Sequence, residues 1–502
     1  MTKARIIERL RGGLAGALLT ISAAASSVGG FGAAASSATA ADAFTPFMSE
    51  AEEDRIGKEE HPKVLQEFGG AYPDASIQKY VTSLGGLLKA TTPQVNKPYT
   101  FTVLDSDVVN AFALPGGYVY VSRGLMALAN DEAELAGVVG HEIGHVVARH
   151  TAQRYSQSVI AGIGAAILGA ITKSQTLGQV AQLGAAAYVQ GFSRDQELEA
   201  DQLGIQYMTL SGFEPSAMST FLGSLEGENQ LALKKAGKEG TDPEASLFSS
   251  HPRTADRVAA AARTAASNAQ GPIARDREIY LKKIDGMIYG DSPSQGFVDG
   301  PHFKHPELKI SFDAPPGFRL QNGQAALIGR QKGGSAAFQF DGDRLVGGQR
   351  SMASYLTSTW APKLGLGNVE SFTVNGMEAA TGNARVRTDN GQQELRFVAI
   401  RFDADQVYRF MMIGAPEIPS ALEMQFREMV HSFRRLSERE AAILRPRRLR
   451  VVTVAKGDTP EKLAQRMAVD EFPLETFLAL NGLKSGVKLE PGSKMKIVVN
   501  GS

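Results

Sequence analysis

Two histidines and a glutamate interrupt an otherwise apolar segment, GVVGHEIGHVVARH, which runs from Gly137 to His150. His141 and His145 are four residues apart, and Glu142 directly follows the first of them. Residues four apart on a helix differ by about 40° around its axis, so both imidazoles can reach one cation from the same face. Imidazole is a good Zn²⁺ ligand, and Glu142 can reach a water molecule bound to the same cation.

The alternative to a metal site is a pair of hydrogen-bonded core histidines with Glu142 at the surface. Polar groups on the packed face of an apolar helix cost free energy unless they have partners, which favours the metal site. His150 follows His141 by nine residues, which places it about half a turn round the same helix. We therefore expect His150 to point away from the cation and do not count it among the ligands.

A catalytic zinc keeps one coordination position open, so a third protein ligand is required. The segment FSRDQELEADQLG offers Glu197 and Asp201, which share one helix face, whereas Glu199 points about 160° away from Glu197. Glu197 would bind the metal, and Asp201 would orient a ligand histidine through its ring N–H. An exposed acidic helix face that includes Arg194 explains the same residues, and spacing alone does not decide between the two interpretations.

The elements that must position these residues are mostly helical between Phe44 and Ala266. Helical patterns cover Asp131–Arg149 and Arg194–Leu210. The strand patterns are YTFTVLDS and, after the turn Pro115-Gly116-Gly117, GGYVYVSRGLM. The small-residue stretch Val159–Val189 is broken by polar residues below the ~20 apolar residues that a membrane span requires. We expect helices that cover the site there, with peripheral membrane contact as the alternative.

Composition excludes several classes of function. The chain has 502 residues, enough for several domains, and its 53 Lys and Arg equal its 53 Asp and Glu, so no net field favours nucleic acid. It has no cysteine, which excludes disulfides, cysteine nucleophiles, thiolate zinc sites and a lipid-modified cysteine.

The N-terminus predicts export. Four basic residues precede an uncharged run, Gly12–Ala41, that ends in the small-residue cleavage pattern Ala38-Thr39-Ala40. We predict a signal peptide at residues 1–40 and a periplasmic protein, with a retained anchor as the alternative.

The rest of the chain divides by composition. A Gly- and Pro-rich linker is expected at 269–307, a small α+β domain at 308–436, and a basic connector at 437–450 that is either a solvated hinge or an anion site. Asn375-Gly376 predicts a hairpin, and helical patterns cover Met352–Leu364 and Ser420–Phe433. Trp360, the only tryptophan, is expected in the core of this domain.

Residues 41–268 resemble the M48 family of zinc metallopeptidases, the gluzincins, in its soluble exported branch. The resemblance is carried by HEIGH, ELEAD, NAFALPGGYVYVSRGLM from Asn110 to Met126, and HPRTADR from His251 to Arg257, in the order that the family has them. It implies a mainly helical domain with a small edge-strand sheet, and it favours Glu197 as the third ligand.

The resemblance also implies roles for the site residues. One Zn²⁺ per chain would be bound by His141, His145 and Glu197, with Glu142 moving the proton of the attacking water. His251 would stabilise the negatively charged oxygens of the intermediate or occupy the fourth zinc position at rest, and Arg257 is a weaker site candidate. Asn110 and Ala111 would border a cleft where an extended peptide pairs with the strand edge.

Residues 451–499 resemble a LysM domain, a small βααβ unit, in VVTVAKGDTPEKLAQRM, ALNGL and PGSKMKI. Asp458 or Thr459 is placed to cap a helix that has Pro460 at its first position. The resemblance implies binding to N-acetylglucosamine polymers such as peptidoglycan, with protein docking as the alternative. We expect this segment to be a separate compact unit.

The sequence thus predicts a multidomain α+β protein. Its expected function is an exported zinc endopeptidase that cleaves misfolded or misassembled envelope proteins and is tethered near peptidoglycan. A zinc hydrolase acting on peptidoglycan and a chaperone or scaffold with a retained zinc fold are the alternatives. The HExxH arrangement fits a peptidase, and the intact Glu142 argues against a scaffold.

Overall fold

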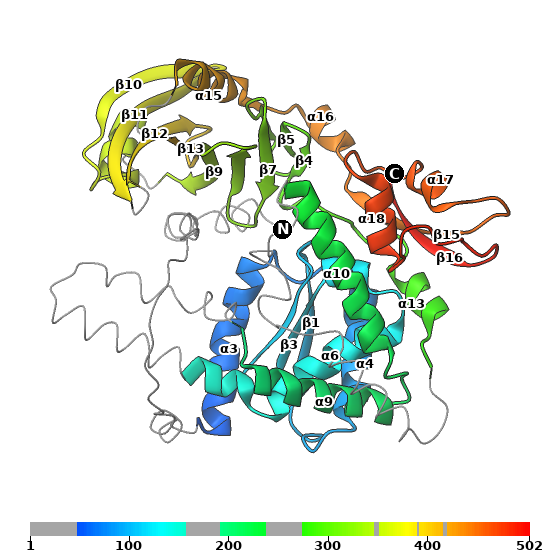
Figure 1. The fold of residues 1–502 in the computed structure, drawn as a ribbon. Coiled ribbons are helices and arrows are strands. Elements are labelled where there is room, and N and C mark those ends of the chain that lie inside the picture. Colours follow the sequence, from blue (N-terminus) through cyan, green and yellow to red (C-terminus); the bar gives the residue numbers. More distant parts are fainter. Residues whose placement is uncertain are drawn as a thin grey trace, which may run out of the picture. The chain divides into compact units, whose positions relative to one another are not determined.

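The computed structural model describes residues 48–156, 191–236, 274–345, 351–388, 391–414 and 419–501. The chain forms two compact units (Figure 1). The helical unit consists of the described residues up to Gly290 together with those from Arg447 onward, and the sheet unit spans Asp291–Pro446. The expected signal peptide and the stretch Val159–Val189 lie outside the described residues. Within the described ranges, no helix is both long enough and apolar enough to cross a membrane.

The N-terminal part of the helical unit surrounds a three-stranded sheet with the strand order β1-β3-β2. β1 pairs with β3 in parallel, β2 pairs with β3 antiparallel, and β2 is therefore an edge strand. The Pro115-Gly116-Gly117 turn joins β2 to β3, and both glycines have a positive φ. The elements are α3 (Glu50–Glu67), α4 (Ala75–Lys89), β1 (Thr100–Leu104), β2 (Ala111–Leu114), β3 (Tyr118–Ser122), α5 (Arg123–Leu128), α6 (Glu132–Val147), α9 (Arg194–Leu210), α10 (Ala217–Ala236) and α13 (Arg277–Ile284).

Helix α6 carries the two histidines of HEIGH. It begins after Asp131, whose side chain accepts a hydrogen bond from the backbone N–H of Glu134, and its first turn is acidic, which suits the helix dipole. It ends at Val147, two residues before Arg149, which adopts a left-handed φ of 61°. Nearly all of its residues are buried, consistent with the apolar sequence.

Helix α9 carries ELEAD and packs along α6. Its bounds, Arg194–Leu210, are those expected from the sequence, and Ser193 caps it in a capping box with Gln196. Glycines at the contact let the two backbones approach closely, because a Cβ on Gly144 would lie 2.9 Å from the carbonyl oxygen of Ala200.

The C-terminal segment forms the expected βααβ order but not a separate unit. Leu449, Phe477 and Ile497 belong to the same hydrophobic core as Val138 and Ile143 of α6. The expectation of an independent unit is therefore wrong, because the module has its apolar face against the rest of the helical unit. Its elements are β15 (Arg447–Thr453), α17 (Pro460–Ala464), α18 (Pro473–Leu480) and β16 (Lys494–Asn500), and Thr459 caps α17.

Lys496 of β16 illustrates how closely this module is attached. The side chain is fully buried, and its ammonium donates to the carbonyls of Ala127, Leu128 and Ala129 at 2.7, 3.1 and 2.7 Å. These carbonyls lie at the end of α5, just before α6 begins. Burial holds the pKa of Lys496 well below its usual value.

The sheet unit contains a seven-stranded sheet, β10-β11-β12-β13-β9-β8-β7, and a four-stranded sheet, β14-β6-β5-β4. Asn375 and Gly376 form the expected hairpin turn with positive φ, and Trp360 is buried in a core cluster. Its elements are β4 (Phe297–Asp299), β5 (His302–His305), β6 (Ile310–Asp313), β7 (Phe318–Asn322), β8 (Leu327–Gln331), β9 (Ala337–Arg344), α14 (Met352–Tyr355), η3 (Leu356–Trp360), β10 (Gly367–Val374), β11 (Met377–Thr388), β12 (Gly391–Arg401), β13 (Gln406–Gly414), α15 (Ser420–Ser432), β14 (Arg434–Arg435) and α16 (Glu438–Ile443).

Two segments expected to connect domains are structured instead. The described part of 269–307 contributes α13 to the helical unit, where Tyr280 and Ile284 are buried, and it contributes β4 and β5 to the sheet unit. The connector at 437–450 contains α16, which has a capping box at Ser437, and the first part of β15. These elements are short, and the buried apolar residues of α13 and β5 belong to cores built from distant segments, so local composition did not reveal them.

Candidate metal centre

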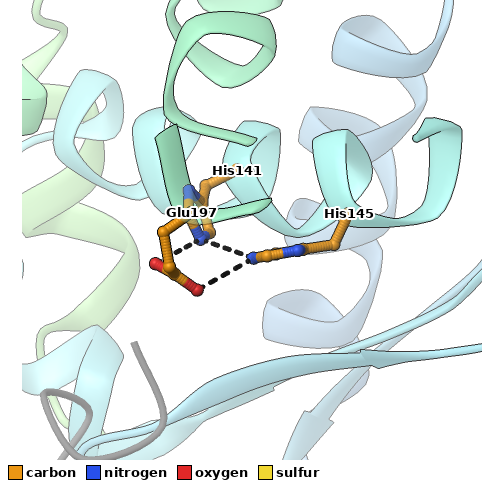
Figure 2. Close-up of side chains that lie close together, drawn as sticks. All are labelled: His141, His145 and Glu197. Carbon is orange, nitrogen blue, oxygen red and sulfur yellow. Dashed lines mark hydrogen bonds and ion pairs between the residues drawn. The ribbon is translucent and has the colours of Figure 1, made fainter. Parts of the chain in front are cut away.

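His141, His145 and Glu197 converge between α6 and α9 (Figure 2). The Nε2 atoms of the two imidazoles lie 2.9 Å apart. The carboxylate oxygens of Glu197 lie 3.7 Å from Nε2 of His141 and 3.4 Å from Nε2 of His145. All three side chains are fully buried, and their donor atoms lie within 4.8 Å of one another.

The donor set fits a zinc ion. Both imidazoles present Nε2 to the same point, while Nδ1 of each ring faces a different partner. Two neutral imidazole nitrogens and one carboxylate are ligands that Zn²⁺ accepts in a three-ligand site with an open fourth position. Packing a buried carboxylate against two imidazoles also provides the negative charge that a cation needs.

Asp201 lies behind His141, one helical turn after Glu197. Its Oδ1 is 3.0 Å from Nδ1 of His141, and its side chain is buried. The sequence placed Asp201 on the same face of α9 as Glu197, and the structure has this arrangement. A carboxylate on the ring N–H of a metal-binding histidine fixes the ring orientation.

His150 contacts the ring of His145 on the side opposite Nε2, so the expectation that it points away from this part of the molecule is wrong. Its Nδ1 lies 3.0 Å from Nδ1 of His145, and its Nε2 lies 3.2 Å from Oε2 of Glu199. The prediction extended α6 through His150 as a regular helix, whereas the left-handed Arg149 ends the helix and redirects the chain. His150 is not among the three clustered residues.

Phe192 is a further neighbour that the sequence did not indicate. Its ring stacks on the imidazole of His145 with centroids 3.8 Å apart and planes 19° apart. The guanidinium of Arg154 lies over the Phe192 ring, 4.3 Å from its centroid. The stacked ring restricts the plane of the His145 imidazole.

The other predicted site residues are placed as follows. Glu142 is buried on α6, directly after His141. Ala111 is the first residue of the edge strand β2, and the backbone N–H of Asn110 donates to the hydroxyl of Ser122 at 3.0 Å. His251 and Arg257 lie outside the described residues.

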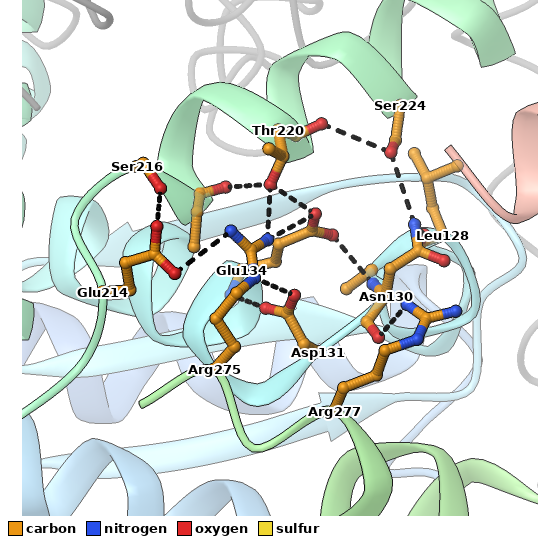
Figure 3. Close-up of polar contacts among 12 residues, drawn as sticks. Leu128, Asn130, Asp131, Glu134, Glu214, Ser216, Thr220, Ser224, Arg275 and Arg277 are labelled. Carbon is orange, nitrogen blue, oxygen red and sulfur yellow. Dashed lines mark hydrogen bonds and ion pairs between the residues drawn. The ribbon is translucent and has the colours of Figure 1, made fainter. Parts of the chain in front are cut away.

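A partly buried polar network surrounds the start of α6 (Figure 3). Arg275 donates to Asp131 and to the hydroxyl of Thr220, both at 2.7 Å, and Thr220 donates to Glu134 at 2.6 Å. Burial, and after it the charge of Asp131, raises the pKa of Glu134. This network fixes the start of the helix that carries both histidines. Thr220 of α10 and Arg275 are distant in the sequence, so local patterns could not predict that they belong to it.

Comparisons with known proteins agree with this geometry. The family model for peptidase family M48 matches residues 74–265, and the LysM domain model matches residues 452–498. The chain is 31% identical to the beta-barrel assembly-enhancing protease of Yersinia pestis over 234 residues, and 33% identical to that of Escherichia coli K12 over 232 residues. Each alignment covers 44% of this chain and 46% of the relative, so the chain spans less than half the length of these relatives.

A smaller relative is covered more completely. The metalloprotease LoiP of Escherichia coli K12 is 31% identical over 186 residues, which are 36% of this chain and 68% of LoiP. The residues matched by the M48 family model include HEIGH, ELEAD and the strand β2. The chain therefore belongs to peptidase family M48, and it carries a LysM domain near its C-terminus.

Proposed function

We propose that this protein is an exported zinc-dependent endopeptidase that cleaves misfolded or misassembled envelope proteins. The observation that carries the proposal is the buried convergence of His141, His145 and Glu197. Each chain would hold one Zn²⁺ through Nε2 of both histidines and a carboxylate oxygen of Glu197. Membership of family M48 supports the same assignment.

The chemistry would be metal-assisted hydrolysis of a peptide bond. When bound, Zn²⁺ polarises the scissile carbonyl and lowers the pKa of the attacking water. Glu142 would accept a proton from this water and deliver it to the leaving amine. His251 would donate to the negatively charged oxygen of the intermediate, with Arg257 as a further candidate. Asp201 would hold the His141 ring in its binding orientation.

Substrates would bind in an extended form along β2. This strand is at the edge of its sheet and packs against α6, which supports a peptide added as a further strand beside the metal centre. Asn110 and Ala111 would border that peptide. Pairing through the main chain depends little on side chains, which suits unfolded or misassembled proteins as substrates. The names of the beta-barrel assembly-enhancing proteases support an envelope substrate.

Export and the LysM domain would together determine where the protein acts in the cell. Residues 1–40 would direct the chain to the periplasm and then be removed. The LysM domain would bind peptidoglycan and hold the peptidase near the cell wall. Because this domain shares a core with α6, a bound glycan would fix the position of the metal centre rather than leave it on a loose tether.

The test compares denatured casein with peptidoglycan sacculi as substrates of the purified exported protein. The proposal expects casein to be cleaved and sacculi to stay intact. Release of soluble fragments from sacculi would instead assign a peptidoglycan hydrolase. Glu142→Gln leaves the three metal-binding residues in place, so it is expected to keep zinc and to lose casein cleavage. A fully active Glu142→Gln would contradict the assigned base.

A further inference from the structure

The two histidines of the metal centre have different partners behind their rings. Nδ1 of His141 lies 3.0 Å from a carboxylate oxygen of Asp201, so a carboxylate orients this ring directly. Nδ1 of His145 lies 3.0 Å from Nδ1 of His150, whose Nε2 lies 3.2 Å from Glu199. The carboxylate of Asp201 therefore contacts the His141 ring directly. The carboxylate of Glu199 reaches the His145 ring only through the imidazole of His150.

One arrangement of protons satisfies the contacts behind His145. Its Nε2 faces Glu197 and must keep a lone pair to bind a metal, so its hydrogen is on Nδ1. This N–H donates to Nδ1 of His150, which places the hydrogen of His150 on Nε2. The Nε2–H of His150 then donates to the carboxylate of Glu199.

We propose that His150 and Glu199 are positioning residues, which fix the tautomer and ring orientation of His145 so that its Nε2 faces the metal. The proposal rests on the metal centre proposed above. Stacking by Phe192 fixes the plane of the His145 ring, but it does not distinguish the ring from its flipped form. The hydrogen bond to His150 makes that distinction, because only one of the two ring orientations brings Nδ1 of His145 to Nδ1 of His150.

The turn after α6 holds His150 in this position. Arg149 has a φ of 61°, a conformation that residues other than glycine rarely adopt. Its Nε donates to the buried carboxylate of Glu53 at 2.7 Å, and its guanidinium also contacts the carbonyl of Met48. This ion pair from α3 offsets the unfavourable backbone and directs His150 inward, where only 2% of the residue is exposed.

The test is the zinc affinity of the full chain, measured by competition with a chromophoric chelator. His150→Leu keeps a similar volume but offers no acceptor to His145, and it is expected to weaken zinc binding on the order of 10- to 100-fold. His150→Asn places an amide oxygen near the position of Nδ1, so its zinc affinity is expected to stay within a few-fold of the unchanged protein. His61→Asn is the matched control, because His61 is also hydrogen-bonded through Nδ1, to Tyr120 at 2.7 Å.

Glu199 provides a second pair of variants that leaves the core intact, since its side chain is 58% exposed. Glu199→Ala is expected to weaken zinc binding a few-fold, and Glu199→Gln, which still accepts from His150, is expected to weaken it less. Thermal unfolding of the metal-free forms of Glu199→Ala and His150→Asn is expected to match the unchanged protein. The rise in Tm on adding zinc is expected to be smaller for Glu199→Ala.

The outcomes separate this inference from the proposed function. An unchanged zinc affinity in His150→Leu would overturn the positioning role. If His150→Leu does not fold, an unchanged affinity in Glu199→Ala overturns it instead. An unaltered protein that binds no zinc contradicts the proposed function itself, before any variant is considered.

Discussion

Gly204 of α9 lies so close to His141 of α6 that a Cβ on Gly204 would be 2.7 Å from the backbone nitrogen of His141. Gly140 of α6 takes part in the same contact, because a Cβ added to Gly140 would be 3.0 Å from the carbonyl oxygen of Gly204. The absence of side chains here lets α9 approach α6 and brings Glu197 to the two histidines. The metal centre thus depends on glycines that bind nothing themselves.

Gly204→Ala is expected to separate the two helices and weaken zinc binding. The added methyl meets backbone, which cannot rotate away, and overpacking of this kind costs about 1–3 kcal/mol of unfolding free energy. Zinc retained after dialysis and Tm check the prediction. Gly223→Ala is the control, because this exposed residue of α10 has open space for a Cβ. It is expected to keep zinc and to raise the free energy of unfolding by about 0.5–1 kcal/mol.

Lys496→Met is expected to destabilise the whole helical unit, not only the LysM domain. It leaves three buried carbonyls without their donor, which lowers the free energy of unfolding by about 2–4 kcal/mol. Urea unfolding measured with hydrogen exchange would show α6 and β16 losing protection together, because they share one core. Lys456→Met serves as the control, because the side chain of Lys456 is exposed. Loss of protection in β16 with α6 unaffected would show that the two parts unfold independently.

The sheet unit is expected to lose stability as the pH falls below about 6.5. Burial lowers the pKa of His305 to about 3, so the unfolded chain binds a proton that the folded unit does not. The stability is complete above the unfolded pKa and is lost as the pH falls from about 6.5 toward 3. Between pH 7 and pH 5.5 the expected loss is about 1 kcal/mol.

Fluorescence of Trp360, the only tryptophan, reports this transition because it lies in the sheet unit. His305→Asn is expected to remove most of the loss, while the exposed His431→Asn is expected to keep it. Identical pH dependence in all three proteins would show that His305 is not responsible.

The sequence predicted the parts of the site that follow from helical periodicity. Spacing put His141 and His145 on one face of α6 and Glu197 and Asp201 on one face of α9, and the bounds of α9 were those observed. It failed for His150, because the left-handed turn at Arg149 is held by Glu53, which lies 96 residues earlier. Long-range pairing of this kind leaves no local pattern in the sequence.

The division into domains was less predictable for the same reason. The LysM order of elements could be read from turns and caps, but its attachment depends on Lys496 reaching Ala129, 367 residues away. The short elements α13, β4 and β5 are stabilised by packing on distant segments rather than by their own composition. A Gly- and Pro-rich stretch therefore suggested a linker where the chain forms helix and sheet.

The most direct test of the metal centre is the zinc content of the purified protein beside His145→Ala and Glu197→Ala, measured by inductively coupled plasma mass spectrometry. The account predicts one zinc per chain in the unchanged protein and loss of zinc in both variants, because each removes one of three converging donors. Zinc retained in Glu197→Ala would show that another residue supplies the third ligand. No zinc in the unchanged protein, even after incubation with zinc, would contradict the account.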